Sequence, residues 1–217
     1  NIYQELGKIY EEFSDIFDTD SERNYVSPED KKSYGIVYTP QILADYVAQK
    51  TISYFLNDLK KKSQRNLNNI RIIDPASGGG QLLHSIWEQL NNQIPPSDPG
   101  LALNPIEILC GIDIDKEAIM ETMSRMSIFS RSNDFFNFKI AKTNALFPFD
   151  SISREEGWKM VKERFDAHEG FDILIANPPW GADINFKESL LRKEYCLYKG
   201  PFESADLFIE LALSVVK

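Results

Sequence analysis

The segment Ile72-Ile73-Asp74-Pro75-Ala76-Ser77-Gly78-Gly79-Gly80 decides the fold of this 217-residue chain. Two β-branched apolar residues lead into an acid, and three glycines then lead into a pattern of apolar residues at helical spacing. This order is typical of a buried strand that passes through a tight loop into a helix. It predicts a strand over residues 70–74 and a helix from Gly80 to about Leu90.

Short apolar runs alternate with helical patterns on both sides of this segment. Upstream, Thr39 and Pro40 stand in the N-cap and first positions of a predicted helix. Downstream we expect further strands over 106–112, 138–141 and 171–176, helices over 116–129 and 205–216, and a charged amphipathic stretch over 154–165. Strands separated by helices indicate an α/β fold, a doubly wound and mostly parallel sheet with ligands at the carboxyl ends of its strands.

Composition describes a globular chain with few cysteines and histidines. Apolar residues make up 42% and charged residues 26%, no apolar run reaches the roughly 18 residues of a membrane span, and the N-terminus lacks a signal-peptide profile. A cytoplasmic location and no membrane contact are therefore expected. Two cysteines and two histidines, without ligand spacing, predict reduced thiols and no metal site.

The net charge of −9 argues against a surface that binds a phosphate backbone by itself. Either the substrate is not nucleic acid, or the basic part lies elsewhere. Because the chain begins at Asn1 rather than Met and ends directly after a helical pattern, we expect it to be a fragment of a longer polypeptide. Residues 1–34 are predicted to be an N-terminal helical segment and connector, and the proline-rich segment 91–105 a surface insertion.

The residues of the glycine loop indicate which kind of ligand it could bind. It matches neither the GxGxxG spacing of dinucleotide sites nor the GxxxxGK[ST] of phosphate loops. Asp74 ahead of the glycines would repel a phosphate, but it suits the cationic amino-acid end of S-adenosylmethionine. Glycines such as Gly78 and Gly80 allow a ligand to approach the backbone closely.

Polar side chains also follow the next two predicted strands. Asp113 ends the second strand, where a carboxylate can accept both hydroxyls of a ribose, and Ile114 can cover one face of an adenine. Asp113 could instead be a helix cap, the role that we assign to Asp115. Asn144, after the third strand, could reach the exocyclic amine of an adenine.

The fourth strand is followed by Asn177-Pro178-Pro179-Trp180. An amide, a rigid turn and a flat ring at a sheet edge are suited to holding a planar ring that carries an amino group. The alternative is that Asn177 forms an ordinary turn and Trp180 belongs to the core.

In this order, the motifs resemble those of the gamma-class, S-adenosylmethionine-dependent N6-adenine DNA methyltransferases of restriction-modification systems. The resemblance extends from about Gly35 to the end of the chain. Asn177-Pro178-Pro179-Trp180 and the later Asp206-Leu207-Phe208-Ile209-Glu210 look most like the large fused restriction and modification enzymes, although a type I modification subunit is also possible.

The resemblance implies that residues 35–217 form an incomplete methyltransferase domain of the Rossmann-like class I type, truncated on its C-terminal side. Each strand end then has a role at the cofactor. The cofactor carboxylate goes to Thr39 and Pro40, the methionine portion to the loop with Asp74, Ala76, Gly78 and Gly80, the ribose to Asp113 with Ile114 beside it, and the adenine to Asn144, Ala145 and Phe208. Asn144 stands where the family usually has an acid, and Ser77 and Gly79 differ from its common Asp-Pro-Ala-Cys-Gly-Ser-Gly loop.

The implied reaction is methyl transfer to the adenine amino group, with Asn177, Pro178, Pro179 and Trp180 as the catalytic set. DNA would be bound through a target-recognition domain outside these residues, together with a fused nuclease or a specificity subunit, so the fragment alone is expected to be inactive. Two alternatives stay open: a methyltransferase acting on RNA or on a protein glutamine, and a noncatalytic module that binds the cofactor.

Overall fold

The computed structural model describes residues 39–61, 67, 69–94, 103–130, 137–179, 188–198 and 203–217. The predicted N-terminal segment 1–34, the central residues 95–102 of the predicted insertion, and Trp180 lie outside these residues.

Four parallel strands form one sheet in the order β3-β2-β1-β4. They are β1 (Ile72–Asp74), β2 (Leu109–Asp113), β3 (Lys139–Lys142) and β4 (Ile173–Leu174). The chain adds β2 and β3 on one side of β1 and then returns to place β4 on the other side. This reversal makes the carboxyl ends of β1 and β4 a topological switch point, which is where open α/β sheets bind ligands. The predicted doubly wound parallel sheet is confirmed.

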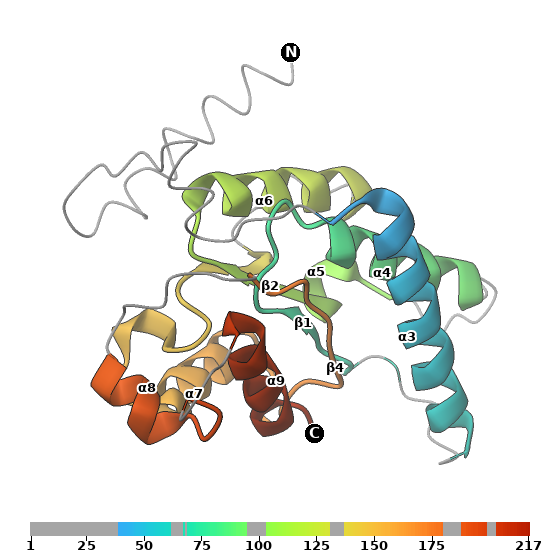
Figure 1. The fold of residues 1–217 in the computed structure, drawn as a ribbon. Helices are drawn as coiled ribbons and strands as arrows, with labels where there is room; N and C mark the ends of the chain where they lie inside the picture. The colour runs from blue at the N-terminus through green and yellow to red at the C-terminus, as the bar shows by residue number, and fades with distance from the viewer. Residues whose placement is uncertain are drawn as a thin grey trace. The chain divides into compact units, whose positions relative to one another are not determined.

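Helices cover both faces of the sheet (Figure 1). On one face lie α4 (Gln81–Gln93) and α6 (Lys116–Ser130), and α3 (Gln41–Lys61) packs against α4. The other face carries α7 (Arg154–Arg164), α8 (Glu188–Glu194) and α9 (Ser204–Val215). Alternate strand residues divide between the two faces. Ile73, Cys110 and Ile112 point into the core that α7, α8 and α9 complete.

A polar network fixes the first two turns of α3 against α4. Ser85 Oγ donates to Asp45 Oδ1 at 2.7 Å, and Gln81 Nε2 donates to Gln41 Oε1 at 2.6 Å. Ser85 is fully buried, so its hydrogen bond offsets the cost of burying a hydroxyl. These bonds hold the start of α3 beside the start of α4, next to the glycine loop.

Two predicted strands differ from the structure. The strand predicted over 106–112 is wrong in its first part, where one helical turn, α5 (Pro105–Ile108), precedes β2. Asn104 Oδ1 caps this turn by accepting from the backbone N–H of Ile106 at 3.1 Å, and Pro105 occupies the first helical position. The strand predicted over 171–176 contains only the two residues of β4, with an isolated parallel bridge between Phe171 and Val216.

The other predicted elements agree with the structure to within a few residues. The structure also contains two further short elements that were not predicted. These are α8 and the 3-10 turn η2 (Pro148–Asp150). Within the described ranges, no helix is both long and apolar enough to cross a membrane, and no group of three or more metal-ligating side chains is found.

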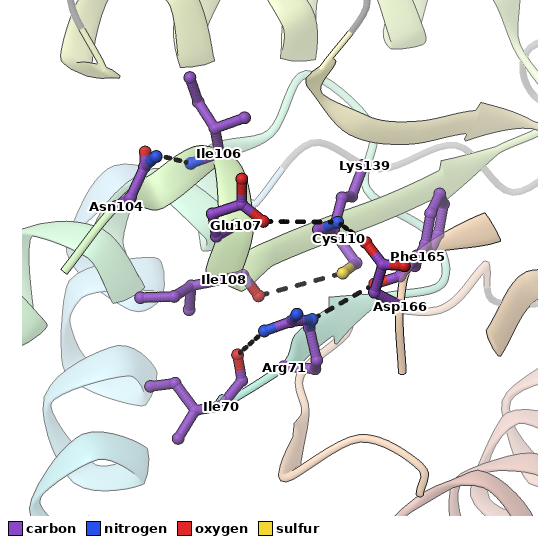
Figure 2. Close-up of polar contacts among 10 residues, drawn as sticks. All are labelled: Ile70, Arg71, Asn104, Ile106, Glu107, Ile108, Cys110, Lys139, Phe165 and Asp166. Atoms are coloured by element: carbon purple, nitrogen blue, oxygen red, sulfur yellow. Dashed lines mark hydrogen bonds and ion pairs between the residues drawn. The ribbon is translucent and has the colours of Figure 1, made fainter. Parts of the chain in front are cut away.

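The amino-terminal edge of the sheet is closed by a cluster of charges (Figure 2). Lys139, at the start of β3 and only 9% exposed, pairs with Asp166 at 2.8 Å and with Glu107 at 3.7 Å. Arg71, just before β1, donates from Nε to the carbonyl of Phe165 at 3.3 Å. Side-chain contacts therefore tie β1 and β3 to the neighbouring loops at this edge, whereas the predicted site residues follow the carboxyl ends of the strands.

Candidate active site

Asp74 is a buried acid at the end of β1. It is 1% exposed, and its Oδ1 accepts from the backbone N–H of Ala76 at 3.0 Å. No donor to Oδ2 is found within the described part of the chain. Burial raises the pKa of Asp74 to about 8, against the lowering effect of the Ala76 N–H, and the charge of Asp113 raises it further. A cationic group placed at Oδ2 would give this oxygen a partner and would favour the ionised form of the acid.

Asp113, at the end of the neighbouring strand, anchors the glycine loop. Its Oδ2 accepts from the backbone N–H of Gly78 at 2.8 Å, and its Oδ1 accepts from the N–H of Asp115 at 2.9 Å. Burial raises the pKa of Asp113, although both of these hydrogen bonds oppose the shift. Each carboxylate oxygen can accept more than one hydrogen bond, so the group can hold the loop and still accept a ribose hydroxyl. Asp115 caps α6 through the N–H of Glu117 at 2.9 Å, as predicted.

Helix α6 holds the glycine loop from the other side, through two residues that the sequence did not reveal. Thr122 Oγ1 donates to the carbonyl of Gly78, and Arg125 Nε donates to the carbonyl of Gly79, each at 2.7 Å. In a trans peptide the C=O and the following N–H point in opposite directions. With its carbonyl turned to Thr122, Gly78 therefore leaves the N–H of Gly79 pointing away from α6.

Gly78 and Gly80 are required in the loop for different structural reasons. Gly78 has φ +49°, and a Cβ there would meet no heavy atom within 4 Å, so the loop is open at this point. Gly80 has φ +75°, and a Cβ there would lie 3.1 Å from Thr122. Gly78 thus leaves space for a ligand, whereas Gly80 permits the close packing of α6.

The residues predicted to hold an adenine are divided between an exposed position, a loop and the core. Ile114 is 49% exposed directly after β2, as an apolar cover for a ligand would be. Asn144 is partly buried, and its Oδ1 accepts from the N–H of Leu146 at 2.9 Å. Ala145 and Phe208 are buried in the core that α7, α8 and α9 complete, and the Ala145 carbonyl accepts from the indole of Trp158 at 2.9 Å.

Asn177 lies beyond β4, beside the start of α3. The N–H of Ile175 still bonds to the carbonyl of Ile73 at 3.0 Å, so the segment leaves the sheet next to β1. The side-chain Nδ2 of Asn177 then donates to Thr39 Oγ1 at 3.2 Å. Two motifs 138 residues apart thus meet at one edge. Thr39 does not occupy the predicted N-cap position, because Ala44 donates its N–H to the carbonyl of Pro40 at 3.0 Å and the helix begins one residue later.

Pro178 and Pro179 are partly buried in an extended segment that α9 supports. Ser204, the first residue of α9 and 2% exposed, donates its hydroxyl to the carbonyl of Pro179. This bond ties the end of the segment to the start of α9. No pattern in the sequence pointed to Ser204.

The predicted site residues therefore fall into three groups. One group surrounds the glycine loop with Asp74 and Asp113, and a second joins Thr39 to Asn177. Ala145 and Phe208 form the third group, which lies in the core. The structure gives no position for Trp180.

Solved structures with a similar architecture include a methyltransferase and a restriction-modification enzyme. One from Listeria monocytogenes, assigned as a class I S-adenosylmethionine-dependent methyltransferase, has a TM-score of 0.50 and 16% identity over 86% of this chain and 47% of its own. A nuclease-deletion mutant of the Type ISP restriction-modification enzyme LlaGI, solved with a DNA substrate mimic, has a TM-score of 0.55 and 18% identity over 100% of this chain and 25% of its own. At these identities the likeness shows the fold alone, which is that of the class I methyltransferases.

Sequence comparison supplies the family. The Type II methyltransferase M.BanIII from Aneurinibacillus aneurinilyticus is 32% identical over 152 residues, which are 69% of this chain and 22% of that protein. The chain thus spans about a fifth of the length of this curated relative. The model of the Eco57I restriction-modification methylase family matches residues 107–217, about half of the chain and its last three strands. The chain therefore belongs to the Eco57I restriction-modification methylase family.

Proposed function

We propose that this chain carries the cofactor site and the methyl-transfer centre of an enzyme that methylates the N6 amino group of adenine in DNA. The observation that carries the proposal is the meeting of four strand ends at one edge, with the buried Asp74 and the partly buried Asp113 beside an open glycine loop and an amide beyond β4. Membership in a restriction-modification methylase family supports DNA as the substrate.

The residues at this edge suit S-adenosylmethionine. The orphaned Asp74 Oδ2 fits the ammonium of its amino-acid end, and the open space at Gly78 fits a ligand lying against the backbone. Asp113 would accept the ribose hydroxyls, with the exposed Ile114 against the adenine and Asn144 near its amine. Thr39 and the first turn of α3 would hold the carboxylate, since a helix N-terminus favours an anion. Ala145 and Phe208 would contribute to the adenine pocket from the core behind it.

S-adenosylmethionine supplies an electrophilic methyl group. The protein must make the adenine amine nucleophilic, because its nitrogen lone pair is delocalised into the ring. If the two amine hydrogens donate to Asn177 Oδ1 and to the Pro178 carbonyl, the nitrogen can become pyramidal and direct its lone pair at the methyl group. Ser204 supports this arrangement by holding the neighbouring Pro179 carbonyl. No base would be needed before attack, because the bond from nitrogen to methyl would form as the bond from sulfur to methyl breaks, with S-adenosylhomocysteine as the leaving group, and the then cationic nitrogen would lose its proton to water.

The target base must leave the duplex to reach the edge of the sheet, and Trp180 is proposed to stack on it. The chain carries a net charge of −9, which does not favour binding of a phosphate backbone by the chain itself. We therefore propose that a target-recognition domain elsewhere in the protein binds DNA, with a nuclease fused to it or a specificity subunit beside it. An enzyme acting on DNA in this way belongs in the cytoplasm, and residues 35–217 alone should have little activity.

Methyl-labelled cofactor tests the substrate class. The full-length protein is incubated with unmethylated DNA, with RNA of matched base composition and with glutamine-containing peptides, and the DNA is then digested to nucleosides. The proposal expects label in N6-methyldeoxyadenosine. Label confined to RNA or to peptide would support the alternative substrates, and cofactor binding without any transfer would support a noncatalytic module.

A further inference from the structure

The hydrogen bond from Ser204 to Pro179 joins the segment beyond β4 to the start of a helix. Ser204 is the first residue of α9 and is 2% exposed, and its hydroxyl donates to the carbonyl of Pro179. The two residues are 25 positions apart in the chain. The carbonyl that ends Asn177-Pro178-Pro179 is therefore held by a buried side chain of another element.

Helix α9 is itself anchored on two sides. Leu207 and Leu211 are 0% exposed and belong to the core beneath the sheet. Farther along the helix, Glu210 accepts from Arg154 at 3.1 Å, which ties α9 to the start of α7. A carbonyl bonded to Ser204 is thus bonded to a fixed frame.

The two prolines carry this constraint back along the chain. The ring of Pro179 fixes its φ at about −65°, so its ψ alone sets the angle between the Pro179 carbonyl and the peptide group before it. That preceding group contains the Pro178 carbonyl. With the Pro179 carbonyl bonded to Ser204, the direction of the Pro178 carbonyl is restricted relative to α9. Asn177 also precedes a proline, which restricts it to extended conformations.

We propose that Ser204 is a positioning residue for methyl transfer, which acts by directing the Pro178 carbonyl at the target amine. This inference rests on the proposed function, in which that carbonyl and Asn177 Oδ1 accept the two amine hydrogens. Ser204 acts only through the prolines and touches neither the target nor the cofactor. Its loss should therefore slow methyl transfer and leave the cofactor site around Asp74 and Asp113 intact.

A target without an amino group separates this role from a structural one. Purine lacks the amine of adenine, so it has no hydrogen to donate to the Pro178 carbonyl. If Ser204 only stabilised α9, its loss would weaken the binding of adenine and purine targets equally. If Ser204 directs the carbonyl, its loss weakens the adenine target more.

The test uses the full-length protein, Ser204→Ala and a matched control. Ser153→Ala is the control, because Ser153 caps α7 by accepting from the N–H of Glu156 at 3.1 Å and contributes a structural hydroxyl elsewhere. Three quantities are measured: cofactor affinity, single-turnover methyl transfer at saturating cofactor, and the affinity for two duplexes in the presence of S-adenosylhomocysteine. The duplexes carry adenine or purine at the position found by mapping wild-type methylation.

Methyl transfer by Ser204→Ala should fall at least about 10-fold at saturating cofactor, since a displaced acceptor no longer orients the amine. Cofactor affinity should stay within about 2-fold of wild type, because the glycine loop is untouched. The preference for adenine over purine should fall at least about 3-fold relative to wild type, as expected for one hydrogen bond. The cost of opening each base pair is the same for both proteins and cancels in this comparison. Ser153→Ala should keep the wild-type rate and preference.

An unchanged preference for adenine over purine in Ser204→Ala would overturn the proposal, as would a wild-type rate of transfer. Thermal unfolding shows whether Ser204→Ala is folded. If it is not, Ser204→Cys is measured in the same way, since a thiol nearly keeps the shape but is a weak donor. A wild-type protein that methylates no adenine in DNA would refute the proposed function itself. An active wild-type protein whose Ser204→Ala variant behaves like Ser153→Ala would refute only the role of Ser204.

Discussion

The carboxylate of Asp113 accepts a hydrogen bond from the backbone N–H of Gly78 at 2.8 Å, so the acid that ends β2 shapes the loop that follows β1. Two strand ends thus form one unit, and neither is independent of the other. A ligand that touches the glycine loop touches a backbone whose conformation depends on Asp113. This relationship changes what a substitution at Asp113 is expected to do.

Asp113→Ala should weaken S-adenosylmethionine binding at least 10-fold, because it removes the proposed ribose acceptor and releases the loop. A hydrogen bond to a charged group contributes about 1.5–3 kcal/mol, and two such bonds are lost. Isothermal calorimetry measures the affinity. Asp115→Ala is the matched control. It removes the cap of α6, which should lower the free energy of unfolding by about 1 kcal/mol, and it should leave the cofactor affinity near that of the wild-type protein. Wild-type affinity in Asp113→Ala would contradict both roles of this acid.

Cofactor binding should release a proton from Asp74. With its pKa raised to about 8, this acid is mostly protonated near pH 6.5 in the free protein, and an ammonium beside Oδ2 would favour the ionised form. Calorimetry at pH 6.5 in two buffers of different ionisation enthalpy measures the number of protons released. The value should approach one for the wild-type protein and zero for Asp74→Asn. Equal values in both proteins would place the ammonium elsewhere.

The same acid should make the free protein less stable as pH rises. The pKa of Asp74 is about 8 in the folded protein, against an ordinary value of 3.8, so its favourable contribution to stability is full below about pH 4 and is lost as the pH approaches 8. Asp74→Asn cannot ionise. Thermal unfolding from pH 5 to 8.5 should therefore show the melting temperature of Asp74→Asn rising relative to wild type. A difference that does not change with pH would contradict the buried, protonated state.

Thr122→Val should loosen the glycine loop from α6 without changing the shape of the core. Thr122 is fully buried, and losing its hydroxyl removes the hydrogen bond to the Gly78 carbonyl. This should lower the free energy of unfolding by about 1–3 kcal/mol. Urea unfolding should show this loss, and cofactor affinity should fall with it. Thr122→Ser keeps the hydroxyl and is the control. Equal stability of the Val and Ser variants would show that the bond to Gly78 is unimportant.

Much of the fold was predictable, because β-branched runs and helical patterns alternate clearly. The prediction of a strand from residue 106 failed because apolar residues such as Ile106 and Ile108 fit a strand and a helical turn equally well. Asn104 as the N-cap and Pro105 at the first helical position favour the helical turn. The short helix α8 lacks a distinct period, since seven residues complete only two turns.

The site was predictable where a motif carries its chemistry in consecutive residues, as Asp74 to Gly80 does. The contacts that join motifs were not predictable. The bonds from Thr122 and Arg125 to loop carbonyls, from Ser204 to Pro179 and from Asn177 to Thr39 arise only when distant helices meet the strand ends. Ala145 and Phe208 show a second limit of sequence-based prediction. They belong to motifs that resemble a binding site, yet both are buried in the core.

The most direct test of the central claim is single-turnover methyl transfer by full-length Asn177→Ala, measured together with its cofactor affinity. Transfer of label to N6-methyldeoxyadenosine should fall at least about 100-fold, as expected on removing an essential electrostatic partner of the transition state. Cofactor affinity should stay within about 3-fold of wild type, since Asp74, Asp113 and the glycine loop are untouched. Near wild-type transfer by Asn177→Ala would contradict the claim that the edge beyond β4 is the catalytic centre.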